Sequence, residues 1–293
     1  MASLKEVKGR IATVNNTRKI TSAMKMVASA KLHKAQGTIA HMLPYQQRLS
    51  ALLGNLLQGG DVLTWNTPRA EVKRIALVVI SSNASLCGGF NANVIKHATQ
   101  WLDEHQSLPK EDILLYPVGK KVADALTKAG YTVQGDFQHL SDKPTFAEAA
   151  SLAQQLMDKF ERGEVDRVEL LYNHFKNTAT QILTHEVYLP FATCHPEEHS
   201  DEGSRKHQEE IDYILEPSRE ELLAMLLPKV LRLKLYTVLL DSNASEHAAR
   251  TMAMQIATDN ADDLLQELTL MYNKTRQQAI TNELLDIVSG SMA

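Results

Sequence analysis

The sequence predicts a protein of the α/β class, in which a long antiparallel coiled coil of the N- and C-terminal helices carries an α/β domain. Three observations predict this arrangement. Helical periodicity runs through both ends of the chain, strand and helix patterns alternate between them, and only 5% of the 293 residues are aromatic although 44% are hydrophobic. An interior that is poor in aromatic residues and rich in Ala and Met favours helix–helix packing.

Residues 1–58 are predicted to form the first helix of the coiled coil. It opens with a capping box of Ser3 and Glu6. Apolar residues then recur at alternating spacings of three and four, as a coiled-coil seam requires; they are Leu4, Val7, Ile11 and Val14, and later Leu32, Ala35, Ile39 and Met42. Between these two groups, the seam positions of the same heptad fall on Arg18, Thr21, Lys25 and Ala28. The apolar residues there lie instead on a neighbouring stripe, at Ile20, Met24 and Val27. We therefore expect one helix of about 75 Å whose contacts change along its length.

Residues 70–192 are predicted to form the α/β domain. The segment 74–81 is short, apolar and β-branched, as in a strand that is buried on both faces. The patterns that follow predict strands at 112–118 and 131–133, a hairpin of 167–175 with 180–189, and helices at 91–105, 120–128 and 146–162. This order gives a Rossmann-like sheet with an antiparallel pair at one end.

Residues 193–212 are predicted to be a mobile acidic connector. The segment CHPEEHSDEGSRKHQEE is polar and turn-prone. Its Cys, His and Glu side chains could form a metal cluster, but Pro196 interrupts a helical spacing of the histidines and no C-x-x-C pair is present. A solvated loop is therefore favoured over a metal site.

Residues 213–293 are predicted to form the second helix of the coiled coil. Ser218 and Glu221 form another capping box, and Pro228 is expected to end or kink a first short helix. No Pro or Gly occurs from there to about residue 288, which predicts a helix of about 90 Å. A polar band at 273–278 separates two apolar stripes. Pairing the two terminal helices in antiparallel orientation buries the stripes of both.

The formal charge of −4 conceals a basic N-terminus. Residues 1–50 hold nine Lys or Arg and one acid, which gives +8 and leaves −12 on the remainder. Such an asymmetry indicates an acidic partner, either nucleic acid, anionic lipid or an acidic protein surface. A basic helix could bind DNA, but apolar residues interrupt its basic face. A solvated helix face is the simplest interpretation.

The chain offers no strong motif for catalysis. The turn 81–91 (SSNASLCGGFN) lies where a phosphate-binding loop would be, yet it matches neither the dinucleotide fingerprint nor the P-loop, so a structural turn is favoured. No G-x-S-x-G elbow occurs. Two cysteines, Cys87 and Cys194, make no disulfide framework, which favours a reducing compartment, and we expect no secretory leader and no membrane span.

Four segments resemble the γ subunit of F-type ATP synthase, and together they extend over the whole chain. They are residues 4–36, the turn 81–91, YNHFKN at 172–177, and residues 244–293, which contain the I-T-x-E-x-x-x-I-V-x-G pattern. The chain departs from the family at Asn83 and Ala84, which replace part of a charged turn. The resemblance, with no transit peptide and no regulatory cysteine pair, implies a bacterial chain.

The resemblance implies a central rotor without catalytic residues, cofactor or metal. Its expected partners are the α and β subunits of the F1 ring, the ε subunit and the c-ring of Fo, with neither nucleic acid nor a membrane span of its own. The expected location is the cytoplasmic face of the bacterial inner membrane. The resemblance implies eight subunit-contact residues, namely Arg18, Lys19, Met24, Lys25, Arg276, Gln277, Ile280 and Leu284.

Two other functions stay open on the sequence alone. One is a nucleotide- or substrate-binding α/β enzyme with a helical appendage, which needs a ligand at Gly88 and Gly89. The other is a basic coiled-coil protein that binds nucleic acid, for which a steep dependence of binding on salt would be diagnostic.

Overall fold

The computed structural model describes residues 3–57, 69, 71–106, 108–191, 215–216 and 218–291. The chain begins and ends with two long helices, α1 (Leu4–Leu57) and α6 (Arg219–Ser291). Between them lie the strands β1 (Ile75–Ile80), β2 (Ile113–Val118), β3 (Arg167–Phe175) and β4 (Gln181–Leu189). The shorter helices are α2 (Phe90–Glu104), η1 (Lys110–Asp112), α3 (Lys120–Lys128), α4 (Gln138–Asp142) and α5 (Phe146–Glu161).

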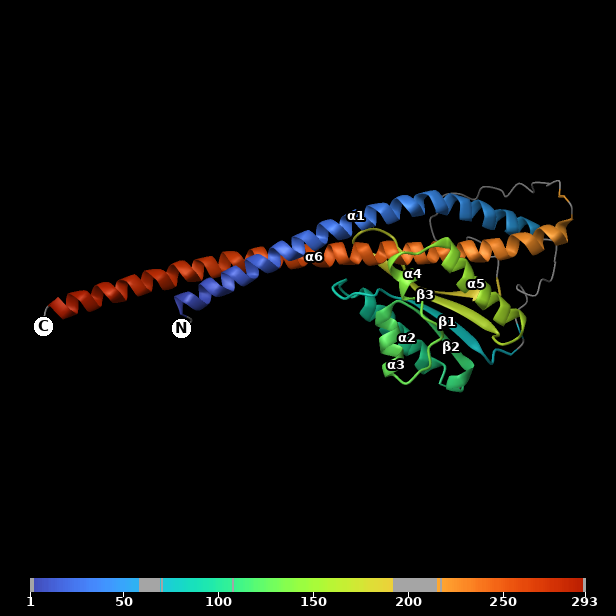
Figure 1. Cartoon of the computed structure of the whole chain (residues 1–293), viewed down its shortest axis with the longest axis horizontal. Coiled ribbons are helices and arrows are strands. Elements are labelled where there is room, and N and C mark those ends of the chain that lie inside the picture. The colour runs from blue at the N-terminus through green and yellow to red at the C-terminus, as the bar shows by residue number, and fades with distance from the viewer. Residues whose placement is uncertain are drawn as a thin grey trace, which may run out of the picture.

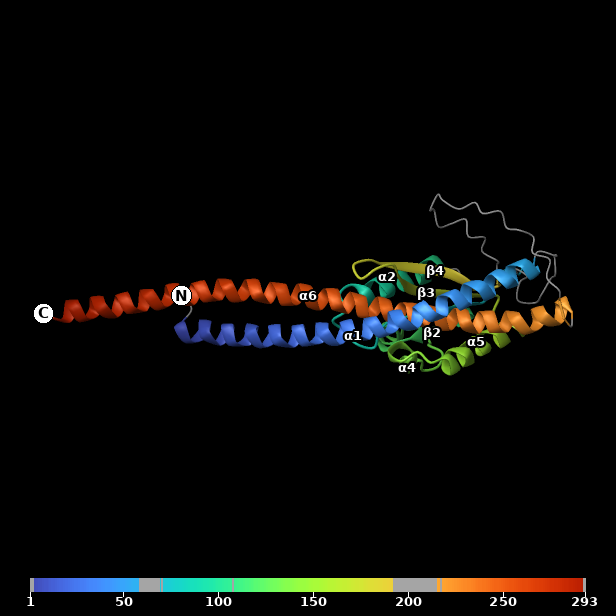
Figure 2. The ribbon, with the colours of Figure 1, turned by 90° about the horizontal axis from the view of Figure 1, so that it is seen from above.

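The two long helices form the predicted antiparallel coiled coil (Figures 1 and 2). The α/β domain lies against one half of this rod, beside the C-terminal half of α1 and the N-terminal half of α6. The register is visible in a cluster of small and apolar side chains, where Leu32 and Ala35 of α1 pack against Ala244 and Ala248 of α6. Small residues at a seam let the helix backbones approach closely.

The seam continues through the polar middle of α1. Of the apolar stripe expected at Ile20, Met24 and Val27, only Met24 is partly buried, and the expectation is wrong for Ile20 and Val27. Arg18 pairs with Asp262 and Thr21 with Thr258, both across the coil, and Ala28 is fully buried. Ile20 and Val27 are 60% and 59% exposed. A continuous helix keeps its heptad position, so the polar residues of the seam pair with polar partners while Ile20 and Val27 beside them face outward.

Both long helices begin with half of the predicted capping box. Ser3 Oγ accepts a hydrogen bond from the Glu6 N–H at 3.3 Å, and Ser218 Oγ accepts one from the Glu221 N–H at 3.2 Å. The Glu6 carboxylate instead binds Arg10, one turn further along the helix.

The prediction that Pro228 ends a short first helix is wrong, because α6 continues through this residue. A kink at Pro228 stays a prediction. A proline inside a helix removes one backbone hydrogen bond and crowds the preceding turn. Here the buried side chains Leu227, Val230 and Leu231 anchor the helix on both sides of the proline. Tertiary packing therefore overrides the tendency of proline to end a helix.

The sheet has the order β2-β1-β3-β4. β1 pairs in parallel with β2 and β3, and β3 pairs antiparallel with β4, so the predicted antiparallel pair at one end is confirmed. The predicted strand at 131–133 is wrong, since this segment makes only an isolated bridge between Val133 and Leu115. Gly130 and Gly135 adopt positive φ on either side of it, which leaves too little extended chain for a strand. The five-residue α4 was not predicted.

Helices cover both faces of the sheet, as a buried parallel strand requires. Alternate residues of β1 point to opposite faces, so that Val78 belongs to a core with α5 and α6, and Leu77 to a core with α2 and α3. The end of α1 joins the first core through Leu53 and Leu56. The coiled coil thus forms one layer of the α/β domain, and the two share a hydrophobic core.

Candidate functional site

The C-terminal end of α6 extends beyond α1 as a single helix (Figure 1). The register set by Arg18 with Asp262 places the start of α1 near residue 275 of α6, and the following residues 276–290 are all exposed. The unaccompanied part is about 20 Å long. It carries apolar side chains that no described part of the chain covers, at Ile280, Leu284, Leu285, Ile287 and Val288. A cluster of this kind marks a surface for a partner.

Four of the eight expected contact residues lie on or beside this tip. Arg276 and Gln277 are exposed beside the start of α1. Ile280 and Leu284, which are 46% and 57% exposed, follow on the single helix. The structure therefore brings these four residues together on one accessible segment.

The other four expected contact residues form a second group, on α1. Lys19 is exposed, and Met24 and Lys25 are partly buried. Arg18 already binds Asp262 at 2.9 Å, with 39% of its side chain exposed, so part of its charge is used within the coil. By the register of Arg18 with Asp262, this group lies about 20–30 Å from Arg276 along the rod.

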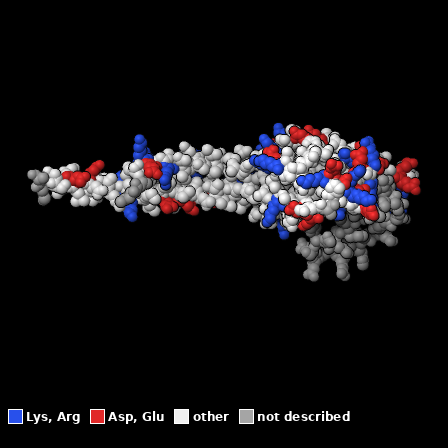
Figure 3. Space-filling view, turned by 90° about the horizontal axis from the view of Figure 1, so that it is seen from below, with Lys and Arg blue, Asp and Glu red and all other residues white. Residues whose placement is uncertain are grey.

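The basic charge of the N-terminus stays largely unneutralised within the described part of the chain. Of the nine Lys and Arg in residues 1–50, ion pairs there engage only Arg10, with Glu6, and Arg18, with Asp262. Figure 3 shows that charged side chains gather on the domain and at separate places on the rod, with a stretch between them that lacks charge on this face. Exposed Met26 and Val27 add apolar surface to α1. The rod thus alternates basic and apolar surface along its length.

The edge of the sheet where nucleotides bind in related α/β folds is closed by the chain itself. Ligands of such folds lie at the carboxyl ends of the parallel strands, at the strand where the order reverses, here β1. Asn83 Oδ1 accepts from the Lys120 N–H at 2.8 Å and Ser81 Oγ from the Val122 N–H at 3.1 Å. Side chains thus accept hydrogen bonds from the N–H groups at the start of α3, which would otherwise be available to a phosphate.

α6 covers the same edge. Asn243 Nδ2 donates to the Ser141 carbonyl at 2.8 Å, and Arg250 Nη1 donates to the Ser85 carbonyl at 2.6 Å. The gap that remains between Ile80 and Glu246 holds only about 10 Å³, roughly one water. This space is too small for a nucleotide.

The turn 81–91 is a structural turn, as the sequence favoured. Asn91 Oδ1 accepts from the Ser82 N–H at 3.0 Å, and its Nδ2 donates to Ser82 Oγ at 2.8 Å. Gly88 has a φ of +59°, a conformation that favours glycine. The polar groups of the turn therefore satisfy one another.

A polar clasp formed by His174, Phe175 and Asp241 fastens the end of β3 to α6. Asp241 Oδ1 accepts from the Phe175 N–H at 3.0 Å, and Asp241 Oδ2 lies 2.5 Å from His174 Nδ1. The hydrogen bond with Asp241 holds the pKa of the His174 imidazole above its ordinary value. Sequence reasoning missed this clasp, because a single Asp in a helix gives no signal of the strand that it will meet.

Other expectations concern metal binding, the connector and the membrane. The connector at 193–212, with its candidate metal ligands, lies outside the described residues. Among the residues that are described, no three His, Cys, Asp or Glu side chains come together as a metal site would require. No helix in the described ranges is both long and apolar enough to cross a membrane.

Comparison with solved structures finds the same fold in rotary ATP synthases. The rotor of the Euglena gracilis mitochondrial ATP synthase aligns with a TM-score of 0.62 at 18% identity, over 94% of this chain and 98% of that chain. The central stalk/c-ring structure of the Tetrahymena thermophila mitochondrial enzyme aligns with a TM-score of 0.58 at 24% identity, over 81% of this chain and 99% of that chain. At these identities the likeness supports the fold.

Sequence comparison identifies the family. A family model described as ATP synthase matches residues 3–293. The ATP synthase gamma chain of Phocaeicola vulgatus is 63% identical over the full length of both chains, and that of Bacteroides fragilis is 57% identical over the full length of both. The gamma chain of Flavobacterium johnsoniae is 46% identical over 100% of this chain and 99% of its own. Since these matches run from end to end, the chain belongs to the ATP synthase gamma chain family.

Proposed function

We propose that the chain is the central rotor of an F-type ATP synthase, which couples proton-driven rotation of a c-ring to ATP synthesis or hydrolysis at catalytic β subunits. The observation that carries this proposal is the shape of the molecule. A rigid coiled coil is fastened to a domain at one end and extends at the other into an exposed apolar single helix. The solved structures that share this fold belong to the rotor and the central stalk of mitochondrial ATP synthases, which supports the same function.

The rotor acts by differential binding. An asymmetric rod that turns inside a ring presents a different surface to each ring subunit in turn. Each orientation stabilises one conformation of the neighbouring β subunit over another, and the nucleotide affinity of that subunit changes by the difference. The chain itself forms and breaks no covalent bond, and catalysis lies in the other subunits.

The proposed contacts follow the two groups of residues. Arg276, Gln277, Ile280 and Leu284 lie within the upper part of the ring, where the apolar tip turns against the surrounding subunits. Lys19 and Lys25, with their neighbours Arg18 and Met24, face acidic segments of the β subunits lower on the rod. Interface energy concentrates in few residues, so one or two of the eight dominate.

The α/β domain is the proposed foot of the rotor, on the ε subunit and the c-ring. The chain is thereby a peripheral part of a membrane complex, on the cytoplasmic face of a bacterial inner membrane. The clasp and the shared core of α6 and the sheet support this role, because a foot that transmits torque must turn together with the rod.

The geometry favours the rotor over a nucleotide-binding enzyme. The chain's own α6 covers the edge of the sheet where the nucleotide would lie, and side chains bind the N–H groups at the start of α3. A nucleotide at this edge of the sheet would require these contacts to open.

Reconstitution with the other F1 subunits tests the proposal. We expect the purified chain alone to bind no ATP, to assemble with an α3β3 ring, and to rotate within it when ATP is supplied. Replacing Ile280 and Leu284 together with serine should lower ATP-driven rotation and hydrolysis without preventing folding. Lys128→Ala, at the far end of α3, is the matched control and should leave both unchanged. A lone chain that hydrolyses ATP would overturn the proposal.

A further inference from the structure

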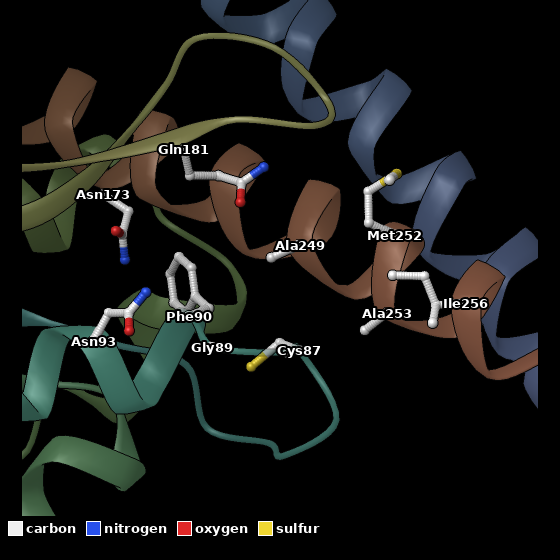
Figure 4. A pocket seen from close by; sticks show the side chains of 11 residues that line it. Cys87, Gly89, Phe90, Asn93, Asn173, Gln181, Ala249, Met252, Ala253 and Ile256 are labelled. Atoms are coloured by element: carbon white, nitrogen blue, oxygen red, sulfur yellow. The ribbon is translucent and has the colours of Figure 1, made fainter.

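A cavity of about 420 Å³ lies at the junction of the α/β domain and α6, beside the closed nucleotide edge (Figure 4). Three parts of the chain form its walls: the turn that leads into α2, the facing ends of β3 and β4, and one face of α6. Its volume falls within the ~300–1,000 Å³ that is typical of small-molecule sites. The cavity therefore offers room for a ligand that the rotor function does not require.

Asn173 supplies a hydrogen-bond donor that has no partner. The residue is 4% exposed, and its Nδ2 makes no hydrogen bond within the described part of the chain. Figure 4 shows the Asn173 amide directed at Asn93, which lies on the other side of the cavity. A buried N–H without an acceptor is unfavourable, so a ligand that provides an acceptor oxygen here would gain a hydrogen bond that the free protein lacks.

The α6 wall of the cavity is apolar. Met252 and Ile256 are 37% and 55% exposed, and the Phe90 ring lies across from this helix (Figure 4). No Lys, Arg, Asp or Glu is among the lining residues. A charged ligand would lose hydration without meeting a counter-charge, which favours a neutral one.

The size of the cavity indicates a compact ligand. A helix with its side chains is ~10–12 Å across, so this volume would hold about one helical turn. A docked partner helix would leave most of its length outside. A molecule with a carbonyl at one end and an apolar body matches the walls better.

We propose that this cavity binds a neutral amphipathic small molecule, whose carbonyl oxygen accepts a hydrogen bond from Asn173 Nδ2 and whose apolar body packs between Phe90 and the Met252–Ile256 face of α6. The proposal does not depend on the rotor function, because it concerns the full chain by itself. The lining offers no charged side chain to pair with a nucleotide or another anion.

The neutral fluorophore 6-propionyl-2-(dimethylamino)naphthalene is a suitable probe, because it joins one ketone to an apolar ring system and reports on its surroundings. We expect saturable binding to the full chain with one site. Ala253→Trp, which fills the cavity from α6, should weaken binding at least tenfold. Asn173→Leu should weaken it about threefold to tenfold and shift the emission to shorter wavelength, because the ketone loses its donor.

Leu270→Ser is the matched control, because it removes an exposed apolar side chain from α6 about 20 Å along the helix from Ile256 and should leave binding unchanged. Thermal melting by circular dichroism checks that each variant is folded. Binding that survives both Ala253→Trp and Asn173→Leu would overturn the proposal, as would binding that does not saturate. Binding to the full chain but not to the assembled ATP synthase would show that a partner subunit fills the cavity, and would also overturn it.

Discussion

Replacing Asp241 with asparagine tests how firmly the α/β domain is fastened to the coiled coil. The carboxylate meets the Phe175 N–H at 3.0 Å and His174 Nδ1 at 2.5 Å, so it holds two consecutive residues at the end of β3. Asparagine keeps the size of the side chain but removes its charge. The substitution therefore isolates the electrostatic part of the clasp.

The expected loss follows from the exposure of the two partners. Hydrogen bonds to charged groups contribute about 1.5–3 kcal/mol when they are protected from solvent. The Asp241 side chain is 14% exposed, but that of His174 is 50% exposed, so solvent screens the ion pair. We expect Asp241→Asn to lower the free energy of unfolding by about 2 kcal/mol in total. For a chain of this size the melting temperature should fall by roughly 4–8 °C.

The loss should depend on pH. Asp241 raises the pKa of His174, and Glu186 adds to this effect by its charge. A raised folded-state pKa gives stability that is fully present below the unfolded pKa of about 6.5 and is lost as pH rises through the folded value. The difference between wild type and Asp241→Asn should therefore be largest near pH 5.5 and smaller near pH 9.

Urea unfolding followed by circular dichroism at several pH values measures this difference. Asp263→Asn is the matched control, an exposed aspartate on the same helix, and should change stability by less than about 0.5 kcal/mol. A difference for Asp241→Asn that is below about 0.5 kcal/mol, or that does not vary between pH 5.5 and 9, would refute the reasoning.

Two further predictions concern the seam of the coiled coil. Ala248→Leu should destabilise the chain by about 1–3 kcal/mol, because Ala248 is fully buried against Leu32 and Ala35 and the added volume must separate the helices. Thermal melting measures the loss; Ala30→Leu, at an exposed position of α1, should cost little, and equal losses in the two variants would contradict the packing argument. A double-mutant cycle of Arg18→Met with Asp262→Ala should give a coupling of about 0.2–1 kcal/mol, because both side chains are well exposed. A coupling of several kcal/mol would mean that the pair is protected from solvent.

Local patterns were sufficient to predict most of the elements. The alternation of apolar residues predicted both long helices, and the buried β-branched runs predicted β1, β2 and the hairpin of β3 with β4. Three errors have a common cause. The break at Pro228, the strand at 131–133 and the displaced stripe at Ile20 all follow local preference. Buried side chains overrode it at Pro228, flanking glycines of positive φ at 131–133, and the helix register at Ile20.

The expected contact residues also divide into those that the sequence could identify and those whose surroundings only the structure reveals. Resemblance of the terminal sequences named Arg276, Gln277, Ile280 and Leu284, and the structure places all four on the exposed end of α6. It places Arg18 in an ion pair with Asp262, which sequence spacing could not reveal because the partner lies on the other long helix. Their contacts with other subunits stay predictions.

By itself, the sequence determined the two long helices, the parallel sheet with its antiparallel edge, and the family, because periodicity and motifs are properties of contiguous residues. Only the tertiary structure decided which contacts form between segments that are distant in the sequence. The clasp of Asp241 with β3, the covering of the nucleotide edge by Asn243 and Arg250, and the cavity beside Asn173 all join α6 to residues far away in the chain. Such contacts depend on the register of the coiled coil against the sheet, which no local pattern encodes.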